Sequence, residues 1–298
     1  MLTYNVKSVS DTGQVEREAL ESVLARIGSD VACLQEIRPN DDEEADLEAI
    51  AAALGYIDTY WGWKTPLGGA LRNVCMSKFP IDYANSASLS SSDLSSDGLA
   101  NETGRDIVQI RVQVQPGVLY LGVFTVHLKS GFADADRFRR HIEAERLGQA
   151  ISAYRAVHPD DAVVVTGDFN EELGDEWVGS WTSQPDISAS SFHLGSDLPF
   201  PTVYAPFSPV LDEGLLEVVA TAEDNEVDFG TRISGRHIDY VFARGLIVLG
   251  SEVYKSANDN GVDDLPIGRF LEKTGAPLAA DVSALSSDHY PVIVEFTF

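Results

Sequence analysis

Positive charge, cysteine and long apolar runs are all scarce in this sequence. Only 21 of its 298 residues are Lys or Arg, against 47 Asp or Glu, so its formal net charge is −26. A protein that binds nucleic acid mainly by neutralising phosphates needs the opposite sign, which argues against long-range steering of polyanions. A bound metal or a local basic patch can still receive one phosphate. The simpler interpretation of the acid excess is a well-solvated surface.

The two cysteines, Cys33 and Cys75, lie in apolar segments that we predict to be strands. We expect buried free thiols, with a disulfide as the open alternative, because a sequence gives no distance between two residues. No apolar run approaches the roughly 18 residues that a membrane span requires. Since 44% of the residues are hydrophobic and 23% are charged, the composition is that of a globular protein. We expect one domain, residues 1–298, that acts as a monomer.

The start of the chain bears on its location. The sequence has no recognisable signal peptide, and the first predicted strand follows Met1 directly. This abrupt start is typical of a mature or trimmed chain. We therefore favour a secreted or periplasmic location over a cytoplasmic one.

Apolar periodicity predicts both helices and strands. Residues 15–27, 42–54 and 135–155 have apolar side chains at helical spacing, and Gly28 and Gly55 follow the first two, as is common at helix ends. Gln115-Pro116-Gly117 separates two long strand-like segments and predicts a hairpin. The predicted strands cover residues 2–6, 31–35, 73–77, 106–114, 118–128, 162–166, 238–242 and 292–298. Helices between strands indicate an α/β or α+β fold, with strands enough for two sheets.

Two segments lack this periodicity. Residues 85–98 are dominated by serine and aspartate, so we expect an exposed loop there. Residues 171–236 are rich in aromatics and proline, and long ordered loops of this kind often carry specificity. Phe200, Tyr204 and Phe207 in that segment could stack on a base or touch lipid, although a packed loop is the simpler interpretation.

Polar side chains stand at the ends of several predicted strands. Glu36, His127 and Asp168 each follow an apolar run, Asn5 closes the first strand, and Asp288-His289 precedes the last. Carboxylate and amide oxygens are the ligands that Mg²⁺, Mn²⁺ and Ca²⁺ prefer, and histidine titrates near neutral pH. Taken singly, each residue has an ordinary structural explanation as a rim or turn residue. Their combination favours a metal-dependent reaction at one edge of a sheet.

Short motifs occur in a fixed order along nearly the whole chain. They are Thr3-Tyr4-Asn5-Val6, Leu34-Gln35-Glu36, Met76-Ser77-Lys78-Phe79-Pro80, His127-Leu128, Gly167-Asp168-Phe169-Asn170, Ile238-Asp239-Tyr240 and Ser287-Asp288-His289-Tyr290-Pro291-Val292. In this order they resemble the endonuclease/exonuclease/phosphatase superfamily, which includes the DNase I-like nucleases. The resemblance implies a four-layer αββα sandwich, in which two mixed β-sheets pack face to face and helices flank them.

The resemblance also implies a metal site. Glu36 would be the principal ligand of Mg²⁺ or Mn²⁺, with Ca²⁺ as a further candidate, and Asn5 and Asp288 would lie close to the same ion. Asp239 would accept a hydrogen bond from His289 and so orient its ring. His289 would then activate a water for in-line attack or bind the phosphoryl oxygen, and the sequence does not choose between these roles.

The remaining roles concern the phosphoryl group. By the same resemblance, Asp168 would orient the nucleophile or protonate the leaving group, while Asn170 and His127 would donate to the phosphoryl oxygens. Arg105 is a further candidate donor to the phosphate, although an arginine near a strand start is equally often structural. The arginines at positions 137, 139 and 140 could contact a second phosphate, but we favour solvation of a helix start.

The function that follows is hydrolysis of a phosphoester bond. We expect a metal-dependent, nuclease-like phosphodiesterase whose substrate is a nucleic acid, a phospholipid or a small diester. The alternatives are a phospholipid diesterase of the sphingomyelinase type and a phosphomonoesterase. A non-catalytic binding protein of the same family is disfavoured, because every expected acid is present.

Overall fold

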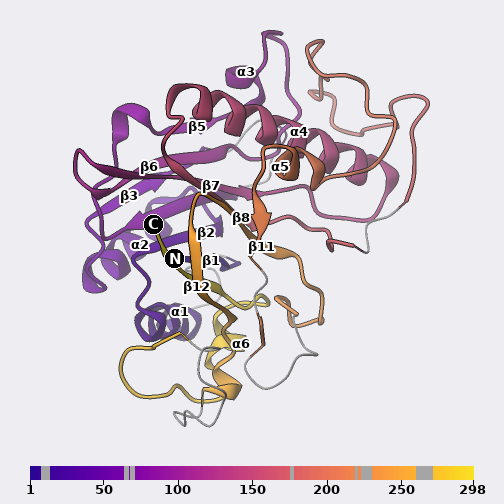
Figure 1. Cartoon of the computed structure of the whole chain (residues 1–298). Coiled ribbons are helices and arrows are strands. Elements are labelled where there is room, and N and C mark those ends of the chain that lie inside the picture. Colours follow the sequence, from indigo (N-terminus) through magenta and orange to yellow (C-terminus); the bar gives the residue numbers. More distant parts are fainter. Residues whose placement is uncertain are drawn as a thin grey trace.

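A computed structural model describes residues 1–7, 14–63, 67, 71–174, 178–218, 221–222, 230–259 and 271–298. Two mixed β-sheets pack against each other, and helices cover their outer faces (Figure 1). The predicted four-layer αββα sandwich is therefore confirmed. None of the described helices is both long and apolar enough to cross a membrane.

The first sheet has seven strands in the described part of the chain. Its strand order is β10-β12-β13-β1-β2-β4-β3. The bounds are β1 Leu2–Asn5, β2 Val31–Ile37, β3 Asp58–Trp61, β4 Arg72–Ser77, β10 Thr221–Ala222, β12 Ile247–Val253 and β13 Val292–Thr297. Strands β1 and β2 are parallel, whereas β13 runs antiparallel to β1 and β4 antiparallel to β2. The carboxyl ends of β1 and β2 thus lie at the same edge as the start of β13.

The second sheet has six strands among the described residues, in the order β5-β6-β7-β8-β11-β9. The bounds are β5 Ala87–Leu89, β6 Ile107–Gln115, β7 Leu119–His127, β8 Ala162–Asp168, β9 Leu216–Glu217 and β11 Asp239–Arg244. The predicted hairpin of β6 and β7 is confirmed, since these strands pair antiparallel. Strands β7 and β8 are parallel and β11 is antiparallel to β8, so His127, Asp168 and Asp239 lie in adjacent register.

The helices are divided between the two outer faces. The bounds are α1 Gln14–Ile27, α2 Asp41–Ala53, α3 Ser91–Leu94, α4 Asp134–Val157, α5 Ser208–Asp212 and α6 Val282–Ser286, with 3-10 turns η1 Tyr83–Asn85 and η2 Ser256–Asn258. Helices α1 and α2 pack on the first sheet, and α4 packs on the second. All three long helices lie where apolar periodicity predicts them, because each must bury one apolar stripe against a sheet.

Three apolar layers form the core. Between the sheets, the cluster is rich in valine and includes Cys33, Cys75 and Val164. Outside them, Leu20 and Leu24 of α1 and Leu147 and other residues of α4 cover the two outer faces. Both cysteines are buried free thiols, as expected. This pattern explains the continuous apolar runs, because a strand buried on both faces has no polar side to alternate with.

The exposed loop that we expected at residues 85–98 is wrong in part. Strand β5 lies inside it and pairs with β6, and the short helix α3 follows. The hydroxyl of Ser91 is buried and accepts hydrogen bonds from the backbone N–H groups of Glu102 and Thr103. Serine therefore serves here as an internal hydrogen-bonding residue rather than as a solvated one.

A long segment over residues 178–207 packs against α4. Tyr204 and Phe207 are buried, whereas Phe200 is 37% exposed. Phe138 of α4 lies edge-on to Trp181, with ring centroids 5.2 Å apart. The packed-loop interpretation is thus confirmed for Tyr204 and Phe207; residues 175–177, 219–220 and 223–229 of the predicted specificity segment lie outside the described residues.

Candidate active site

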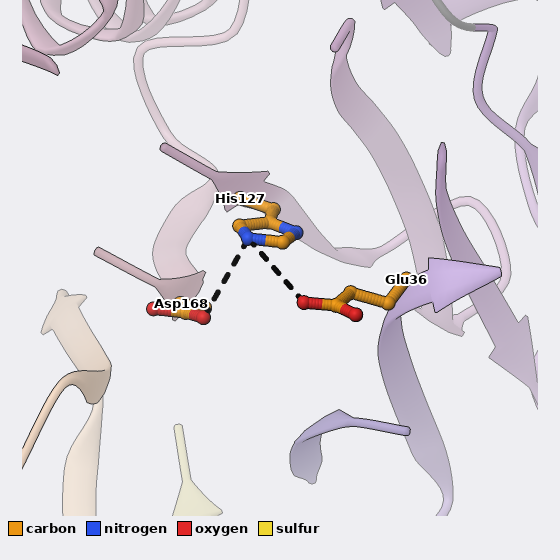
Figure 2. Close-up of side chains that lie close together, drawn as sticks. All are labelled: Glu36, His127 and Asp168. Atoms are coloured by element: carbon orange, nitrogen blue, oxygen red, sulfur yellow. Dashed lines mark ion pairs between the residues drawn. The ribbon is translucent and has the colours of Figure 1, made fainter. Parts of the chain in front are cut away.

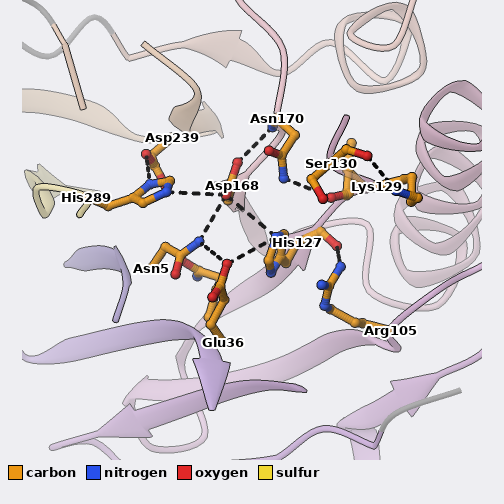
Figure 3. A network of polar contacts seen from close by, with 12 residues as sticks. Asn5, Glu36, Arg105, His127, Lys129, Ser130, Asp168, Asn170, Asp239 and His289 are labelled. Atoms are coloured by element: carbon orange, nitrogen blue, oxygen red, sulfur yellow. Dashed lines mark hydrogen bonds and ion pairs between the residues drawn. The ribbon is translucent and has the colours of Figure 1, made fainter. Parts of the chain in front are cut away.

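Acidic, amide and imidazole side chains converge at one end of the sandwich. Strands β1, β2, β7 and β8 end there and β11 begins there, so side chains distant in sequence become neighbours. Figure 3 shows Asn5, Glu36, His127, Asp168, Asn170, Asp239 and His289 pointing toward a common region between the two sheets. Side chains held by a rigid sheet rim are positioned well enough for chemistry.

Asn5 joins the two carboxylates at the centre. Its amide Nδ2 donates to Glu36 Oε1 and to Asp168 Oδ2, each at 3.0 Å. Nε2 of His127 lies 3.7 Å from the same two oxygens. Dashed lines mark these two contacts in Figure 2. The ligand atoms of Glu36, His127 and Asp168 all lie within 4.8 Å of one another. The second sheet thus contributes His127 and Asp168, and the first contributes Asn5 and Glu36.

A histidine and two aspartates form a second group that shares Asp168. Nδ1 of His289 lies 2.8 Å from Asp239 Oδ2, and Nε2 of the same ring lies 3.9 Å from Asp168 Oδ2. Thr231 donates its hydroxyl to Asp239 Oδ2 at 2.7 Å. The ring of His289 is therefore fixed through Nδ1, and its Nε2 faces the first group.

The two histidines differ in charge because their surroundings differ. Burial, with the cations Arg105, His289 and Lys129 nearby, holds the pKa of His127 well below its usual range, so this ring is neutral at pH 7. Burial alone lowers the pKa of His289 as well, but Asp239, Asp168 and Asp288 outweigh it and raise this pKa to about 9. Burial and the Asp239 carboxylate raise the pKa of Asp168. One imidazole is thus neutral and the other is a cation paired with acid.

The backbone is unusual at the site. Among the described residues, the non-glycine residues with positive φ are Lys7 (54°), Glu36 (66°) and Asn170 (55°). Glu36 lies at a register shift between Leu34 and Ile37, where the pairing of β2 with β4 is interrupted. Left-handed backbone disfavours residues with a Cβ and is concentrated at functional sites. These residues are therefore held in place by the fold around them.

Asn170 is held by the loop that follows β7. Its backbone N–H donates to Asp168 Oδ1 at 2.8 Å, and its side-chain Nδ2 donates to the carbonyl of Leu128 at 3.0 Å. The amide nitrogen is consequently engaged by protein. This bond uses one of the two N–H groups of the amide nitrogen, so donation to a phosphoryl oxygen, as predicted from sequence, does not require the bond to Leu128 to be exchanged.

Asp288 does not join either cluster. Arg232 donates to its Oδ2 at 3.1 Å, and its side chain is 33% exposed. It lines a cavity of about 420 Å³ together with Glu36, Lys7 and Arg38. The structure therefore places Asp288 beside the cluster, paired with an arginine, and not within the group of ligand atoms.

Arg105 lies behind His127. Its Nη1 donates to the backbone carbonyl of His127 at 3.3 Å, while its Nε is buried with no hydrogen-bond partner among the described residues. Burial, the largest influence, lowers the pKa of Arg105. The geometry thus shows a contact with the strand end that carries His127.

The predicted solvation of the helix start by arginine is wrong for Arg140. This side chain is fully buried and donates to the carbonyls of Lys129 and Gly131, to Glu171 Oε2 at 2.5 Å and to Tyr204. The long segment over residues 178–207 covers it, which helix periodicity does not reveal. Arg140 thereby ties together the loops on either side of Asn170.

Sequence reasoning missed Glu143. Its buried carboxylate accepts hydrogen bonds from the backbone N–H of Gly104 at 2.9 Å and of Lys129 at 2.5 Å. These two segments flank His127 and carry Arg105 and Lys129. The only sequence signal is a glutamate three and four residues after arginines on the same predicted helix, which is also typical of an exposed ion pair.

The donor set fits a hard divalent cation. Glu36 and Asp168 offer carboxylate oxygens, while Asn5 turns its amide nitrogen toward them and its Oδ1 accepts the backbone N–H of Lys7. The buried Asp239 also has one oxygen, Oδ1, without a hydrogen-bond partner among the described residues. Carboxylates this close repel each other when ionised, and a cation relieves that repulsion. The residues present are thus compatible with Mg²⁺ or Mn²⁺.

The protein is thus a sandwich of two β-sheets, and acidic residues and histidines line a site at one end of it. The sequence profile of the Endonuclease/Exonuclease/phosphatase family matches residues 2–289. The chain belongs to this family. No curated protein matches the sequence.

Solved structures with the same fold include an endonuclease/exonuclease/phosphatase from Beutenbergia cavernae DSM 12333. It has 18% identity and a TM-score of 0.59, and the match covers 99% of this chain and 70% of that one. ANGEL2, described as a 2',3'-cyclic phosphatase, has 16% identity and a TM-score of 0.56, with 99% and 93% covered. TDP2 of D. rerio, complexed with a single-strand DNA product, has 16% identity and a TM-score of 0.53, with 100% and 98% covered. At these identities the likeness concerns the fold.

Proposed function

We propose that this protein is a divalent-metal-dependent phosphodiesterase that acts by in-line attack of water. The observation that carries the proposal is a pair of clusters that share Asp168. The first consists of Glu36, His127 and Asp168, and the second of Asp168, Asp239 and His289. One cluster suits a cation and the other holds an oriented acid–histidine pair. Such a combination serves phosphoryl transfer, in which charge stabilisation and positioning dominate.

Glu36 and Asp168 would hold the metal, and Asn5 would join them with its Oδ1 once the amide turns its oxygen toward the ion. When bound, the metal neutralises negative charge on the phosphoryl group. The Asp288 that we predicted as a ligand is proposed instead to set the charge of the neighbouring cavity through its pair with Arg232. His127 faces the same carboxylates as a neutral ring, and its role is donation to a phosphoryl oxygen.

The chain's own groups would position the water. Oδ2 of Asp168 and Nε2 of His289 face each other at 3.9 Å, a gap that a water oxygen can bridge by hydrogen bonds. Asp239 holds the ring of His289 in one orientation through Nδ1. The water donates to Asp168 Oδ2, and this carboxylate directs the oxygen lone pair toward phosphorus.

The substrate that we favour is a small diester or a single-strand end. The net charge of −26 opposes binding along a polyanionic duplex. The cavity of about 420 Å³ beside Glu36 is lined by Lys7 and Arg38 and suits a ligand of limited size. Single-strand DNA is the product bound by the similar TDP2, which supports nucleic acid as the first substrate to test. A phospholipid diesterase and a phosphomonoesterase are the alternatives.

A substrate panel with defined metal tests the activity. It contains a generic phosphodiester, a phosphomonoester, a 2',3'-cyclic phosphate, single-stranded and plasmid DNA, RNA and sphingomyelin, each assayed with Mg²⁺, Mn²⁺ or Ca²⁺. We expect hydrolysis of the generic diester and of single-stranded DNA, and loss of both with chelator. Hydrolysis of the monoester alone would overturn the proposed phosphodiesterase.

Metal binding is tested independently of turnover. Titration of Mg²⁺ or Mn²⁺ into chelated protein should raise the melting temperature, because the ion binds the folded state and relieves carboxylate repulsion. Glu36→Gln should abolish this rise, whereas Glu48→Gln on the exposed side of α2 should keep it. An unchanged melting temperature in the wild-type protein would contradict the assigned metal site.

Two substitutions test the catalytic groups. Asp168→Ala and His289→Ala should each lower kcat at least about a hundredfold, the scale of a lost acid–base or positioning group. The matched controls Asp160→Ala and His193→Ala change exposed residues and should leave kcat unchanged. A near-normal rate in a folded Asp168 or His289 variant removes that residue from the proposed mechanism.

A further inference from the structure

Cys33 of β2 and Cys75 of β4 face each other across neighbouring strands. They are direct partners in the antiparallel register, and their Sγ atoms lie 3.1 Å apart. Both residues are 0% exposed and belong to the apolar cluster between the two sheets. The sequence alone does not give the distance between the two sulfur atoms, and the structure shows that it is short.

The position of the two cysteines in the ladder between β2 and β4 favours a disulfide bond between them. The backbone N–H of Lys78 donates to the carbonyl of Asp30, which makes that rung a hydrogen-bonded pair. Hydrogen-bonded and non-hydrogen-bonded pairs alternate along an antiparallel ladder. Three rungs further, the cysteines therefore form a non-hydrogen-bonded pair. Such pairs bring Cα atoms to about 4.5 Å, inside the range of about 4.4–6.8 Å found in disulfides.

We propose that Cys33 and Cys75 close into a cross-strand disulfide when the chain folds in the presence of a small-molecule disulfide such as oxidised glutathione. One thiolate attacks the oxidant and releases one glutathione thiolate, which gives a mixed disulfide. The second cysteine thiolate attacks the protein sulfur of that mixed disulfide and releases the second glutathione. The two cysteines lose two electrons and two protons, and one oxidised glutathione becomes two reduced ones.

The bond forms during folding rather than afterwards. In the native state both sulfurs are sealed between the sheets, and burial raises the pKa of Cys75 well above its usual range. Because the thiolate is the reactive form, exchange in the folded protein is slow. The same burial shields the completed disulfide from reductant. Exposure to oxidant before and after folding should therefore give different products.

The disulfide would hold the strand that presents Glu36. Cys33 lies on the regular part of β2, just before the register shift between Leu34 and Ile37. The closed loop runs from Cys33 to Cys75 and contains all of α2. A bond at this rung would fix the pairing of β2 with β4 next to Glu36. Its stability gain comes mainly from restricting the unfolded chain.

Refolding under two redox conditions tests this proposal. Wild-type protein is unfolded in guanidinium with reductant and refolded either with oxidised and reduced glutathione or with reductant alone. Each sample is then unfolded in N-ethylmaleimide and weighed by mass spectrometry. We expect no adduct and a mass lower by two hydrogen atoms after oxidative refolding, and two adducts after reductive refolding. A non-reduced digest should contain a peptide pair linked through Cys33 and Cys75.

Cys33→Ser and Cys75→Ser are the controls. Each leaves one thiol, and the melting temperature of each should not depend on reductant. In the wild type, the oxidised form should melt about 5–10 °C above the reduced form. Two free thiols, or glutathione adducts, in protein that has refolded by circular dichroism under oxidising conditions would overturn the proposal. A disulfide that leaves the melting temperature unchanged would overturn its stabilising role.

Discussion

The two helical layers of the sandwich are attached to their sheets in different ways. Helices α1 and α2 lie on the first sheet through apolar contacts that include Leu20, Leu24 and Ile50. Helix α4 makes similar contacts through Leu147 and Ile151, but it also buries several charged side chains. Arg140 and Arg146 of α4 are both 0% exposed. The first layer also carries buried charge, because Arg26 of α1 pairs with Asp259 at 2.8 Å and Glu43 of α2 is 0% exposed. The two layers therefore differ in which segments their charges hold.

The partners of the buried charges explain the difference. Arg146 pairs with Glu102 and Asp197, each at 2.8 Å, while Glu143 and Arg140 bind the loops beside His127 and Asn170. Apolar contacts tolerate small shifts, whereas ionic hydrogen bonds are directional. Helix α4 therefore orders loops at the proposed active site, whereas Arg26 of α1 binds Asp259 and the carbonyls of Thr274 and Gly275.

Breaking the Arg146 pair should have the largest effect on stability. Arg146→Met leaves Glu102 buried without its cation, and we expect a loss of about 3–5 kcal/mol in the free energy of unfolding, measured with guanidinium. Arg155→Met is the matched control on the same helix. Its pair with Glu213 is partly exposed, and the loss should stay below about 1 kcal/mol. Equal losses in the two variants would show that the buried charges of α4 have no special role.

Truncation in the apolar layer should rank second. Leu24→Ala removes a fully buried side chain from α1, and we expect a loss of about 2–4 kcal/mol with kcat of the folded protein unchanged. Leu24→Met keeps the volume and should cost less than about 1.5 kcal/mol. A fall in kcat that accompanies Leu24→Ala would show that apolar packing on α1 also affects the proposed active site.

The smallest expected effect depends on pH. Burial lowers the pKa of His141 in α4 to about 4, and its Nδ1 accepts the backbone N–H of Ala205. The unfolded state has an ordinary pKa near 6.5, so it binds a proton that the folded state excludes, and stability is lost as pH falls from about 6.5 toward 4. The α1 and α2 sequences contain no histidine.

The comparison is made with His141→Gln, which cannot titrate in this range. Between pH 8 and pH 5, wild-type protein should lose about 2 kcal/mol more than the variant in urea unfolding. The acid groups elsewhere titrate equally in both proteins and cancel in the difference. A difference that is constant with pH would mean that His141 is not held neutral.

The parts that sequence predicts well are those in which burial and chemistry coincide. The runs that precede Glu36 and Asp168 are largely apolar because their strands are buried on both faces, and Asn5 closes a buried strand in the same way. The ends of these strands can therefore be identified from the sequence, and the structure brings the three residues together. The roles assigned to them stay predictions until the variants are measured.

The parts that sequence does not predict depend on distant contacts. Residues 85–98 resemble a loop, yet β5 pairs with β6 some twenty positions away. Strand β12, Ile247–Val253, was not expected either, because its outer end is exposed and lacks a buried apolar pattern. Arg140 resembles a solvated helix residue until Glu171 and Tyr204 cover it. Likewise, nothing near Asp288 in sequence identifies Arg232 as its partner.

The left-handed backbone at Glu36 implies a conflict between the stability of the folded state and the proposed activity. Glycine has no Cβ and adopts a φ of 66° without strain, whereas glutamate there carries an unfavourable energy of about 1 kcal/mol. Mutations selected only for heat resistance should therefore replace this residue early, and under the proposed role of Glu36 the resulting proteins should be more stable and inactive. A glutamate at this position fits the proposed role of its carboxylate at the metal site, a role that the local loss of stability would serve.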